Sequence, residues 1–422
     1  MSRPRAAIVV TGSELVRGER TDLNGPFFAR EALGLGLEPA RITVVGDRAE
    51  ELEDALRACV ADAELCFVSG GLGPTHDDRT VALVARVSGR ELVLDTELER
   101  RIEEISRGFA ERLRRPYADF ADGVRKQALV PAGSIVLGPV GTAPGLVVEA
   151  DGCVVVVLPG PPGELRRLWP AALETPPVQA VLARARRPSR SALRFFGASE
   201  SAVARALAET GGDGDGVEAT ICARDFEIHV DLVVEPGAEA RAEAIAAGLR
   251  TPLERYLFAE DERTVQEIVL GLCRDRALTL ASAESCTGGL VAARLTEVPG
   301  SSEVFLGGVV AYADAVKRDE LGVSEAVLAA HGAVSAETAA AMAEGVRRRL
   351  GADVGVAVTG VAGPGGGTEE KPVGLVFFHA AGPEGEEALR FELPGDREWI
   401  RMRSAVTALH LVRRLLEKDA RS

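Results

Sequence analysis

The sequence predicts a mixed α/β protein, in which two three-layer α/β domains flank a small α+β domain. Short apolar runs alternate with segments of helical periodicity in residues 5–173 and again in residues 264–416, an order typical of a parallel sheet with helices on both faces. A stretch rich in proline and arginine, residues 173–190, separates the first block from the rest. We therefore expect domains over residues 1–173, 174–260 and 261–422, the second of which includes this linker.

The composition argues against a nucleic-acid-binding or membrane protein. A net charge of −15 disfavours a surface for nucleic acid or anionic membrane. No apolar run reaches the length needed to cross a bilayer, and we expect no signal peptide because the first residues lead directly into an apolar strand. The six cysteines are scattered without a C-x-x-C pair, which is typical of reduced, buried thiols in a cytoplasmic protein.

The first domain is expected to end its third strand in a glycine-rich turn. Apolar runs predict strands at residues 5–11, 42–45 and 65–69, with helices at residues 22–35 and 49–61. The turn that follows, SGGLGPTHDDRT, could hold an anion, and Asp77 and Asp78 stand just beyond it. A carboxylate pair beside a phosphate suggests a divalent metal such as Mg²⁺, bound through the carboxylates and phosphate oxygens. Two adjacent acidic residues are also typical of a solvated turn.

The middle segment has the order strand–helix–strand–strand–helix. Strands are expected at residues 193–196, 217–222 and 226–234, and helices at residues 199–210 and 238–256. Such a unit is small, and it is followed by Thr264-Val-Gln-Glu267, a capping box that should open the first helix of the last domain.

One stretch of the last domain combines nucleophilic side chains with a helix start. An apolar run at residues 278–281 predicts a buried strand, and a polar turn with Ser285, Cys286, Gly288 and Gly289 leads into a helical pattern. The first amides of a helix lack intrahelical partners and favour negative charge. A hydroxyl beside such amides is the arrangement that acyl transfer needs, although a plain strand-to-helix turn has the same pattern.

Two further strand ends carry polar groups that could join this turn. Tyr312 and Lys317 follow an expected strand at residues 305–311, and Thr359 and Gly360 follow one at residues 353–358. Open α/β sheets bind ligands at the carboxyl ends of their strands. We therefore expect these groups and Ser285 to lie at one edge of the sheet.

Six motifs of this half resemble the C-terminal domain of the CinA family (competence/damage-inducible protein A), which is a nicotinamide-nucleotide amidase domain. They are ESCTGG, PGSS, FLGGVVAYADAVK, GAVSAETAAAMA, VTGVAGPGGG and KPVG, and the resemblance spans residues 264–416. It implies Ser285 as nucleophile, Lys317 as its base, Tyr312 in a hydrogen-bonded relay and Thr359 beside it. The reaction implied is deamidation of nicotinamide mononucleotide to nicotinic acid mononucleotide, without metal or cofactor.

The contacts expected around this reaction come from the turn and from the last helix. Amides near the turn would stabilise the oxyanion, and arginines that open the last helix are candidates for the substrate phosphate. The residues expected to bind oxyanion or substrate are Thr287, Gly288, Gly289, Gly360, Arg397 and Arg401. Cys286 is the rival nucleophile because thiols are more reactive at neutral pH, but no His and Asn/Asp partners are suggested near it, and the resemblance favours Ser285.

The first domain resembles the N-terminal domain of the same family, which is related to molybdopterin-binding domains. The motifs are TGSELVRG, TVVGD, SGGLGPTHDD, RKQALVPAG, GTAPG and LPGPPGEL. In some members this domain is a metal-dependent ADP-ribose pyrophosphatase, which implies metal-activated water here and a metal at Asp77 and Asp78. The nucleotide site implied comprises Glu14, Asn24, Gly70, Gly71, Gly73, Thr75, Asp77, Asp78 and Gly160. The segments 13–18 and 21–24 depart from the common family pattern, which leaves the ligand of this pocket open.

The middle segment resembles the small KH-like domain of the family. It has no GXXG loop at the expected helix junction and its surroundings are acidic, so we expect a spacer and dimer contact and not an RNA-binding module. The partners expected are thus small nucleotides, nicotinamide mononucleotide and ADP-ribose, together with a second copy in a homodimer. The alternative is a non-enzymatic nucleotide- or pterin-binding regulatory protein of competence or the DNA-damage response.

Overall fold

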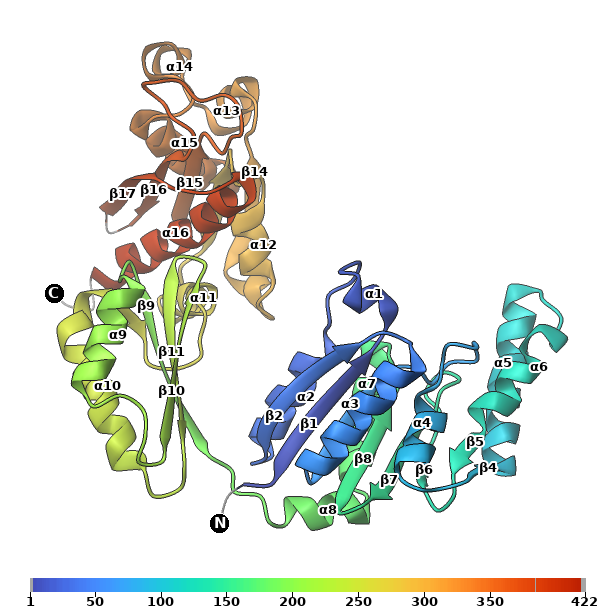
Figure 1. Ribbon diagram of the computed structural model, residues 1–422. Helices are drawn as coiled ribbons and strands as arrows, with labels where there is room; N and C mark the ends of the chain where they lie inside the picture. The colour runs from blue at the N-terminus through green and yellow to red at the C-terminus, as the bar shows by residue number, and fades with distance from the viewer. Residues whose placement is uncertain (1–2, 384, 419–422) are drawn as a thin grey trace. The chain divides into compact units, whose positions relative to one another are not determined.

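The computed structural model describes residues 3–383 and 385–418, and the chain forms two compact units, Met1–Ser189 and Arg190–Ser422. The expected α/β class is confirmed in each unit (Figure 1). No helix in the described ranges is both long and apolar enough to span a bilayer.

The first unit is built on a six-stranded sheet of order β2-β1-β3-β8-β7-β6. Strands β2, β1, β3 and β8 are parallel, and β7 and β6 continue the sheet antiparallel. The first part of the chain provides β1 (Arg5–Thr11), α1 (Ser13–Val16), α2 (Asn24–Gly34), β2 (Glu38–Val45), α3 (Ala49–Asp62), β3 (Leu65–Ser69), α4 (Thr80–Val87) and β4 (Leu92–Leu94). It continues with α5 (Thr96–Leu113), α6 (Ala118–Gln127), β5 (Leu129–Pro131), β6 (Ile135–Leu137), β7 (Gly145–Ala150), β8 (Cys153–Leu158), α7 (Pro162–Leu173) and α8 (Pro176–Leu182).

Both faces of this sheet are buried, as a three-layer architecture requires. Successive side chains of a strand point to opposite faces, and β1 accordingly divides its residues between two cores. Ala7 and Val9 pack under α3, while Ile8 packs with Phe28 and Trp169 of α2 and α7. Part of the expected linker also belongs to this unit, because Val178 and Val181 of α8 are buried in the second core. The expected domain boundary near residue 173 therefore differs from the observed unit boundary at 189.

The second unit contains the small domain and the C-terminal domain together. The small domain is a four-stranded sheet, order β10-β11-β9-β12, with two helices. Its elements are β9 (Ser189–Phe196), α9 (Glu200–Glu209), β10 (Val217–Arg224), β11 (Glu227–Val234), α10 (Glu239–Leu253), the 3₁₀ turn η1 (Glu254–Tyr256) and β12 (Leu257–Ala259). Phe258 and Ala259 of β12 are buried in the main core of the C-terminal domain, with Phe196 of β9 packed against it. The two domains thus share a hydrophobic core.

The C-terminal domain is a five-stranded sheet of order β14-β13-β15-β16-β17. Strand β13 is parallel to both its neighbours, and β16 and β17 are antiparallel. Its elements are α11 (Val265–Asp275), β13 (Leu280–Glu284), α12 (Leu290–Thr296), the 3₁₀ turn η2 (Ser301–Glu303), β14 (Phe305–Val310), α13 (Asp314–Leu321), α14 (Glu325–His331), α15 (Ala336–Leu350), β15 (Val354–Gly360), β16 (Leu375–Gly382), β17 (Gly385–Glu392) and α16 (Arg397–Glu417). The predicted capping box at Thr264 is present and opens α11.

Candidate active site

The turn that carries Ser285 lies at the carboxyl end of a central strand. Strand β13 runs between β14 and β15, with Glu284 opposite Val310 and Val358. The amide of Ser285 donates to the carbonyl of Val358 at 2.9 Å, which fixes the start of the turn. Gly288 and Gly289 have φ values of 61° and 97°, a backbone region that favours glycine. The turn can therefore lead directly into α12 while Ser285 stays at the sheet edge.

The buried carboxylate of Glu284 occupies most of the amides expected to be free. Its side chain is only 1% exposed and accepts hydrogen bonds from the amides of Gly289, Val291 and Ala292 at 2.9–3.1 Å. The expected oxyanion contact from the Gly289 amide is therefore replaced by a side-chain cap of α12. No local pattern in the sequence signals this role of Glu284, which lies at the end of β13 and not in the turn.

The amides of Cys286 and Thr287 lie beside Ser285 and both point at the Cys286 sulfur. The amide of Gly288 donates to the carbonyl of Ser285 at 3.2 Å. Within residues 3–383 and 385–418, no oxygen atom accepts a hydrogen bond from the amide of Cys286 or Thr287. The same turn buries the Thr287 hydroxyl without a hydrogen-bond partner in the described ranges. An oxyanion site at the amides of residues 286 and 287 would lie one step earlier than expected, and it would share these amides with the Cys286 thiol.

Cys286 has the properties of a packed thiol. It is 5% exposed and belongs to the main core, and burial raises the pKa of Cys286 to about 12. Because the thiolate is the nucleophilic form, this environment disfavours Cys286 as the nucleophile. Ser285 is also largely buried, with 8% exposure.

Lys317 lies in the helix that follows the neighbouring strand. It belongs to α13, which follows β14, and its side chain is 1% exposed. Its Nζ donates to the carbonyl of Tyr312 at 3.2 Å and lies 3.5 Å from Oδ1 of Asp314. The hydrogen bonds of the described chain do not include one between Lys317 Nζ and Ser285 Oγ. The strand register nevertheless brings the two segments together, because the amide of Ala311 donates to the carbonyl of Glu284 at 2.8 Å.

Tyr312 and Thr359 have different partners from those that a side-chain relay needs. The Tyr312 hydroxyl accepts a hydrogen bond from Arg397 Nη2 at 2.9 Å, and the ring is 60% exposed. The hydrogen bond that Lys317 Nζ makes to Tyr312 goes to its backbone carbonyl and not to its hydroxyl. Thr359 is fully buried and donates to the carbonyl of Ala333 at 2.6 Å. The expected relay through the Tyr312 hydroxyl is therefore not made in this structure.

Gly360 and the two arginines hold the surroundings of the turn. A Cβ atom at Gly360 would lie 2.7 Å from the carbonyl oxygen of Leu375, so its role is close packing of β15 on β16. Arg401 donates to the carbonyls of Cys286 and Thr287 at 3.1 and 2.9 Å, and Arg397 donates to the carbonyl of Gly363 at 2.7 Å. Neither guanidinium forms an ion pair with a carboxylate of the described residues.

A cavity in the first unit lies around Asn24. Its Nδ2 donates to Ser69 Oγ at 2.9 Å and to the carbonyl of Gly160 at 2.7 Å, and the residue is 7% exposed. A cavity of about 420 Å³ is lined by Glu14, Asn24, Ser69 and Gly160, among others. The structure thus brings together three of the residues expected in the N-terminal site.

Comparison with known proteins identifies the family of this chain. The model of the CinA C-terminal domain matches residues 262–416, and the model of a probable molybdopterin binding domain matches residues 7–178. A CinA-like protein of Mycolicibacterium vanbaalenii is 48% identical over 421 residues, which cover 98% of each chain. This chain belongs to the CinA family. The resemblance expected from the motifs is therefore confirmed.

A second relative of similar length agrees with this membership. A CinA-like protein of Mycobacterium sp. (strain JLS) is 47% identical over 422 residues, covering 98% of this chain and 99% of its own. The solved structure of competence/damage inducible protein CihA from Agrobacterium tumefaciens is 40% identical, with a TM-score of 0.35, and covers 37% of this chain and 99% of that chain.

Three of the other residues expected in the N-terminal site of this CinA protein line a different cavity. Gly71, Gly73 and Asp78 line a smaller hollow of about 110 Å³ together with Lys126 and Gln127. Gly70 lies next to the cavity around Asn24, because a Cβ atom at Gly160 would lie 3.5 Å from the Cα atom of Gly70. The single site expected from sequence is thus divided into two hollows around the end of β3.

The carboxylates expected to bind metal are arranged unequally. Asp78 accepts from the amide of Thr75 at 2.9 Å and from its hydroxyl at 2.5 Å, which stabilises the loop. Asp77 is exposed. Among the described residues, no group of three or more His, Cys, Asp or Glu side chains could hold a metal ion. A metal at Asp77 and Asp78 would therefore need ligand oxygens from a bound phosphate.

Asp47 is a polar residue of this domain that our sequence analysis did not single out. Its carboxylate accepts from the amide and the hydroxyl of Ser13 at 3.0 and 2.6 Å, and from Thr11 Oγ1 at 3.3 Å. These contacts hold the end of β1 against the end of β2. The TVVGD motif contains Asp47, but only the tertiary contact shows what the carboxylate does.

Proposed function

We propose that this CinA protein is a hydrolase that deamidates nicotinamide mononucleotide to nicotinic acid mononucleotide. The observation that carries the proposal is the Ser285 turn, with two amides that lack an oxygen partner in the described chain and the buried Lys317 on the next strand end. A nucleophile, a base and oxyanion donors at one sheet edge are what amide hydrolysis requires.

The proposed reaction proceeds through an acyl-enzyme. Ser285 Oγ attacks the carboxamide carbon, and Lys317 Nζ accepts the hydroxyl proton, a contribution of about 10²–10⁴ in rate. The amides of Cys286 and Thr287 stabilise the oxyanion, and each such donor contributes about 2.7–4 kcal/mol. The C–N bond then breaks, and the lysine returns its proton to the leaving ammonia. Water then attacks the acyl carbon while Lys317 Nζ accepts its proton. The ester bond to Ser285 Oγ breaks, Oγ takes the proton back from the lysine, and nicotinic acid mononucleotide is released.

Arg397 and Arg401 support a substrate with a phosphate group. Their guanidinium groups contact only carbonyl and hydroxyl oxygens of the described residues. Arginine pairs strongly with phosphate oxygens. A 5′-phosphate near the start of α16 would therefore pair with guanidinium groups whose positive charge no carboxylate of the described residues neutralises. Arg401 would then have two roles, since it also holds the Ser285 turn.

For the N-terminal domain we propose hydrolysis of the ADP-ribose pyrophosphate with a divalent metal at Asp77 and Asp78. The cavity around Asn24 and the glycine-rich loop support a nucleotide ligand. The alternative is that this domain binds a nucleotide or pterin without turnover and that the protein regulates competence or the response to DNA damage. Purified protein incubated with ADP-ribose and Mg²⁺ would distinguish them, because only the first forms AMP and ribose phosphate.

We expect chelation to separate the two activities. Release of ammonia from nicotinamide mononucleotide should be unchanged by a chelator, because the proposed amidase groups are side chains and amides only. Any cleavage of ADP-ribose should disappear and return on addition of Mg²⁺. Loss of deamidation in chelator, with recovery by metal, would contradict the proposed amidase mechanism.

Replacement of Cys286 should leave most of the deamidase activity. The Cys286→Ala variant removes a small buried thiol, so we expect a cost mainly in packing and a kcat within a few-fold of wild type. The measurement is steady-state release of ammonia. An inactive Cys286→Ala enzyme beside an active Ser285→Ala enzyme would assign the protein to the cysteine hydrolases.

We also propose that the protein is a homodimer. Light scattering coupled to size-exclusion chromatography would measure its mass directly, and a mass of one chain at micromolar concentration would exclude the proposal.

A further inference from the structure

The turn between β10 and β11 uses two residues with unusual backbone conformations. Asp225 and Phe226 both have positive φ, 51° and 73°. Two-residue hairpin loops with this geometry usually contain Asn-Gly or Asp-Gly, because bulky residues such as Phe are strained in the left-handed region. The side chain of Phe226 in place of glycine indicates that this turn makes contacts that compensate for the strain.

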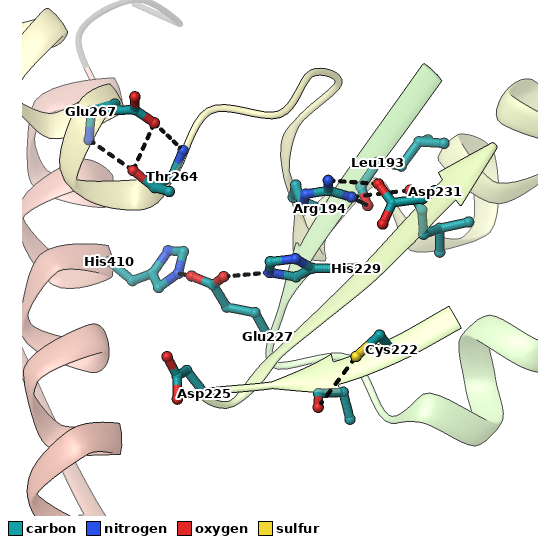
Figure 2. A network of polar contacts seen from close by, with 12 residues as sticks. Leu193, Arg194, Cys222, Asp225, Glu227, His229, Asp231, Thr264, Glu267 and His410 are labelled. Atoms are coloured by element: carbon teal, nitrogen blue, oxygen red, sulfur yellow. Dashed lines mark hydrogen bonds and ion pairs between the residues drawn. The ribbon is translucent and has the colours of Figure 1, made fainter. Parts of the chain in front are cut away.

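Three successive side chains of this turn contact the C-terminal domain. Asp225 forms an ion pair with Arg294 of α12 at 2.7 Å, and both side chains are mostly buried. The Phe226 ring packs edge-on against Phe391 of β17, with centroids 6.2 Å apart. Glu227 Oε1 is 2.7 Å from Nε2 of His410 in α16, as Figure 2 shows.

The contact between Glu227 and His410 is deeply buried and has a defined protonation state. His410 is fully buried, with Phe196 stacked on it at 3.8 Å. Arg413 Nε donates to Nδ1 of His410 at 3.3 Å, so Nδ1 is the acceptor, and the protonated Nε2 donates a hydrogen bond to Glu227 Oε1. Burial lowers the pKa of His410 to about 4. Burial alone raises the pKa of Glu227, but hydrogen bonds from His229 and His410 outweigh it and lower this pKa to about 2.

The two helices reached by this turn are those that frame Ser285. Helix α12 begins directly after the Ser285 turn, and Arg294 lies in its last turn. Helix α16 carries Arg401, which donates to the carbonyls of Cys286 and Thr287. A cavity of about 860 Å³ is lined jointly by the β10–β11 turn, α11, α12 and the start of α16. A displacement of the turn would therefore move both supports of the candidate nucleophile.

We propose that Asp225 and Glu227 are positioning residues for the Ser285 turn, and that the small domain is thereby part of the catalytic unit. The expected role of this domain as a spacer is replaced by a structural role in the amidase site. The inference rests on the proposed amidase function for its kinetic test only. A shift of about 1 Å in a catalytic group can reduce the rate by about 10², which gives this positioning its importance.

The test compares substitutions at the turn with a matched substitution on the same strand. Asp225→Asn keeps a residue that tolerates positive φ, and Glu227→Gln keeps the shape of the side chain. The control is Asp231→Asn, which breaks the ion pair between Asp231 of β11 and Arg194 of β9, also 2.7 Å long, inside the small domain (Figure 2). We expect kcat for nicotinamide mononucleotide to fall about tenfold in both turn variants, with KM within about threefold, and to be unchanged in Asp231→Asn.

A second readout is independent of the substrate. Cys286 is buried in the Ser285 turn, whereas Cys222 is exposed on β10. We expect Asp225→Asn and Glu227→Gln to accelerate alkylation of Cys286 by iodoacetamide about tenfold, measured by peptide mass spectrometry, while Cys222 reacts at the wild-type rate. Asp231→Asn should leave both rates unchanged.

The outcomes separate the two proposals. Wild-type protein that does not deamidate nicotinamide mononucleotide would overturn the proposed function, and the alkylation rates would still decide the positioning role. Turn variants with wild-type alkylation of Cys286 would overturn the positioning role, whatever their activity. Equal acceleration in Asp231→Asn would also overturn it, because the effect would then be general destabilisation.

Discussion

Replacement of Ser285 by alanine is expected to reduce deamidation of nicotinamide mononucleotide by at least about 10³-fold. The variant removes the atom that forms the acyl-enzyme, while the amides of Cys286 and Thr287 remain in place. Lys317→Ala should cost a similar factor, because nucleophile and base act as one unit, and the double variant should be little worse than either single one. Single-turnover measurements of ammonia release would test all three enzymes.

Folding must be controlled in this experiment because Lys317 is buried. Lys317→Met fills nearly the same volume without an amine, so it separates loss of the base from loss of packing. Ser282→Ala is a matched control, since Ser282 lies on the same strand and its hydroxyl donates to Glu284 at 3.3 Å, with no other hydrogen-bond partner among residues 3–383 and 385–418. The mechanism would be rejected if Lys317→Met retained wild-type kcat, or if the double variant lost the product of the two single effects.

Acidification is expected to weaken the second unit between pH 6.5 and 4. The pKa of His410 falls from its ordinary 6.5 to about 4 on folding because the ring is buried, so the unfolded chain binds the proton first as the pH drops. The stability is therefore complete above pH 6.5 and declines as the pH falls toward 4, by at most about 3 kcal/mol for this one group. Glu227 acts in the same direction at lower pH, between 4.5 and about 2, because its pKa is also lowered.

Urea unfolding of the His410→Gln variant would test this dependence. Glutamine can still donate to Glu227 and accept from Arg413 but does not titrate, so its free energy of unfolding should change less over this pH range than that of wild type. The two tryptophans lie in different units, Trp169 in the first and Trp399 in the second, so a Trp169→Phe background reports the second unit alone. His379→Gln, at a histidine 7% exposed and paired with Glu386, is the control. Equal slopes in wild type and His410→Gln would show that His410 is not the titrating group.

Much of this protein follows from local sequence patterns. Apolar runs placed β13, β14 and β15, because burial on both faces of a parallel sheet requires such runs, and helical periodicity placed α12. The position of Ser285 at a strand end and the family motifs were also visible in the sequence. The register of β13 with its neighbours then explains why residues 285, 312 and 359 meet at one edge.

The partners of individual polar side chains were decided only by the tertiary structure. Glu284 follows the apolar run expected as a strand, and only the structure shows that its carboxylate caps α12 from inside the sheet. The Tyr312 hydroxyl is bound by Arg397, which lies 85 residues away in sequence, and Glu227 meets His410 across 183 residues. Spacing along the chain determines which residues share a helix or strand face, because that periodicity is local. It does not determine which distant element packs against that face, and this packing joined the small domain to the core of the C-terminal domain and placed the residues of the expected N-terminal site around two cavities.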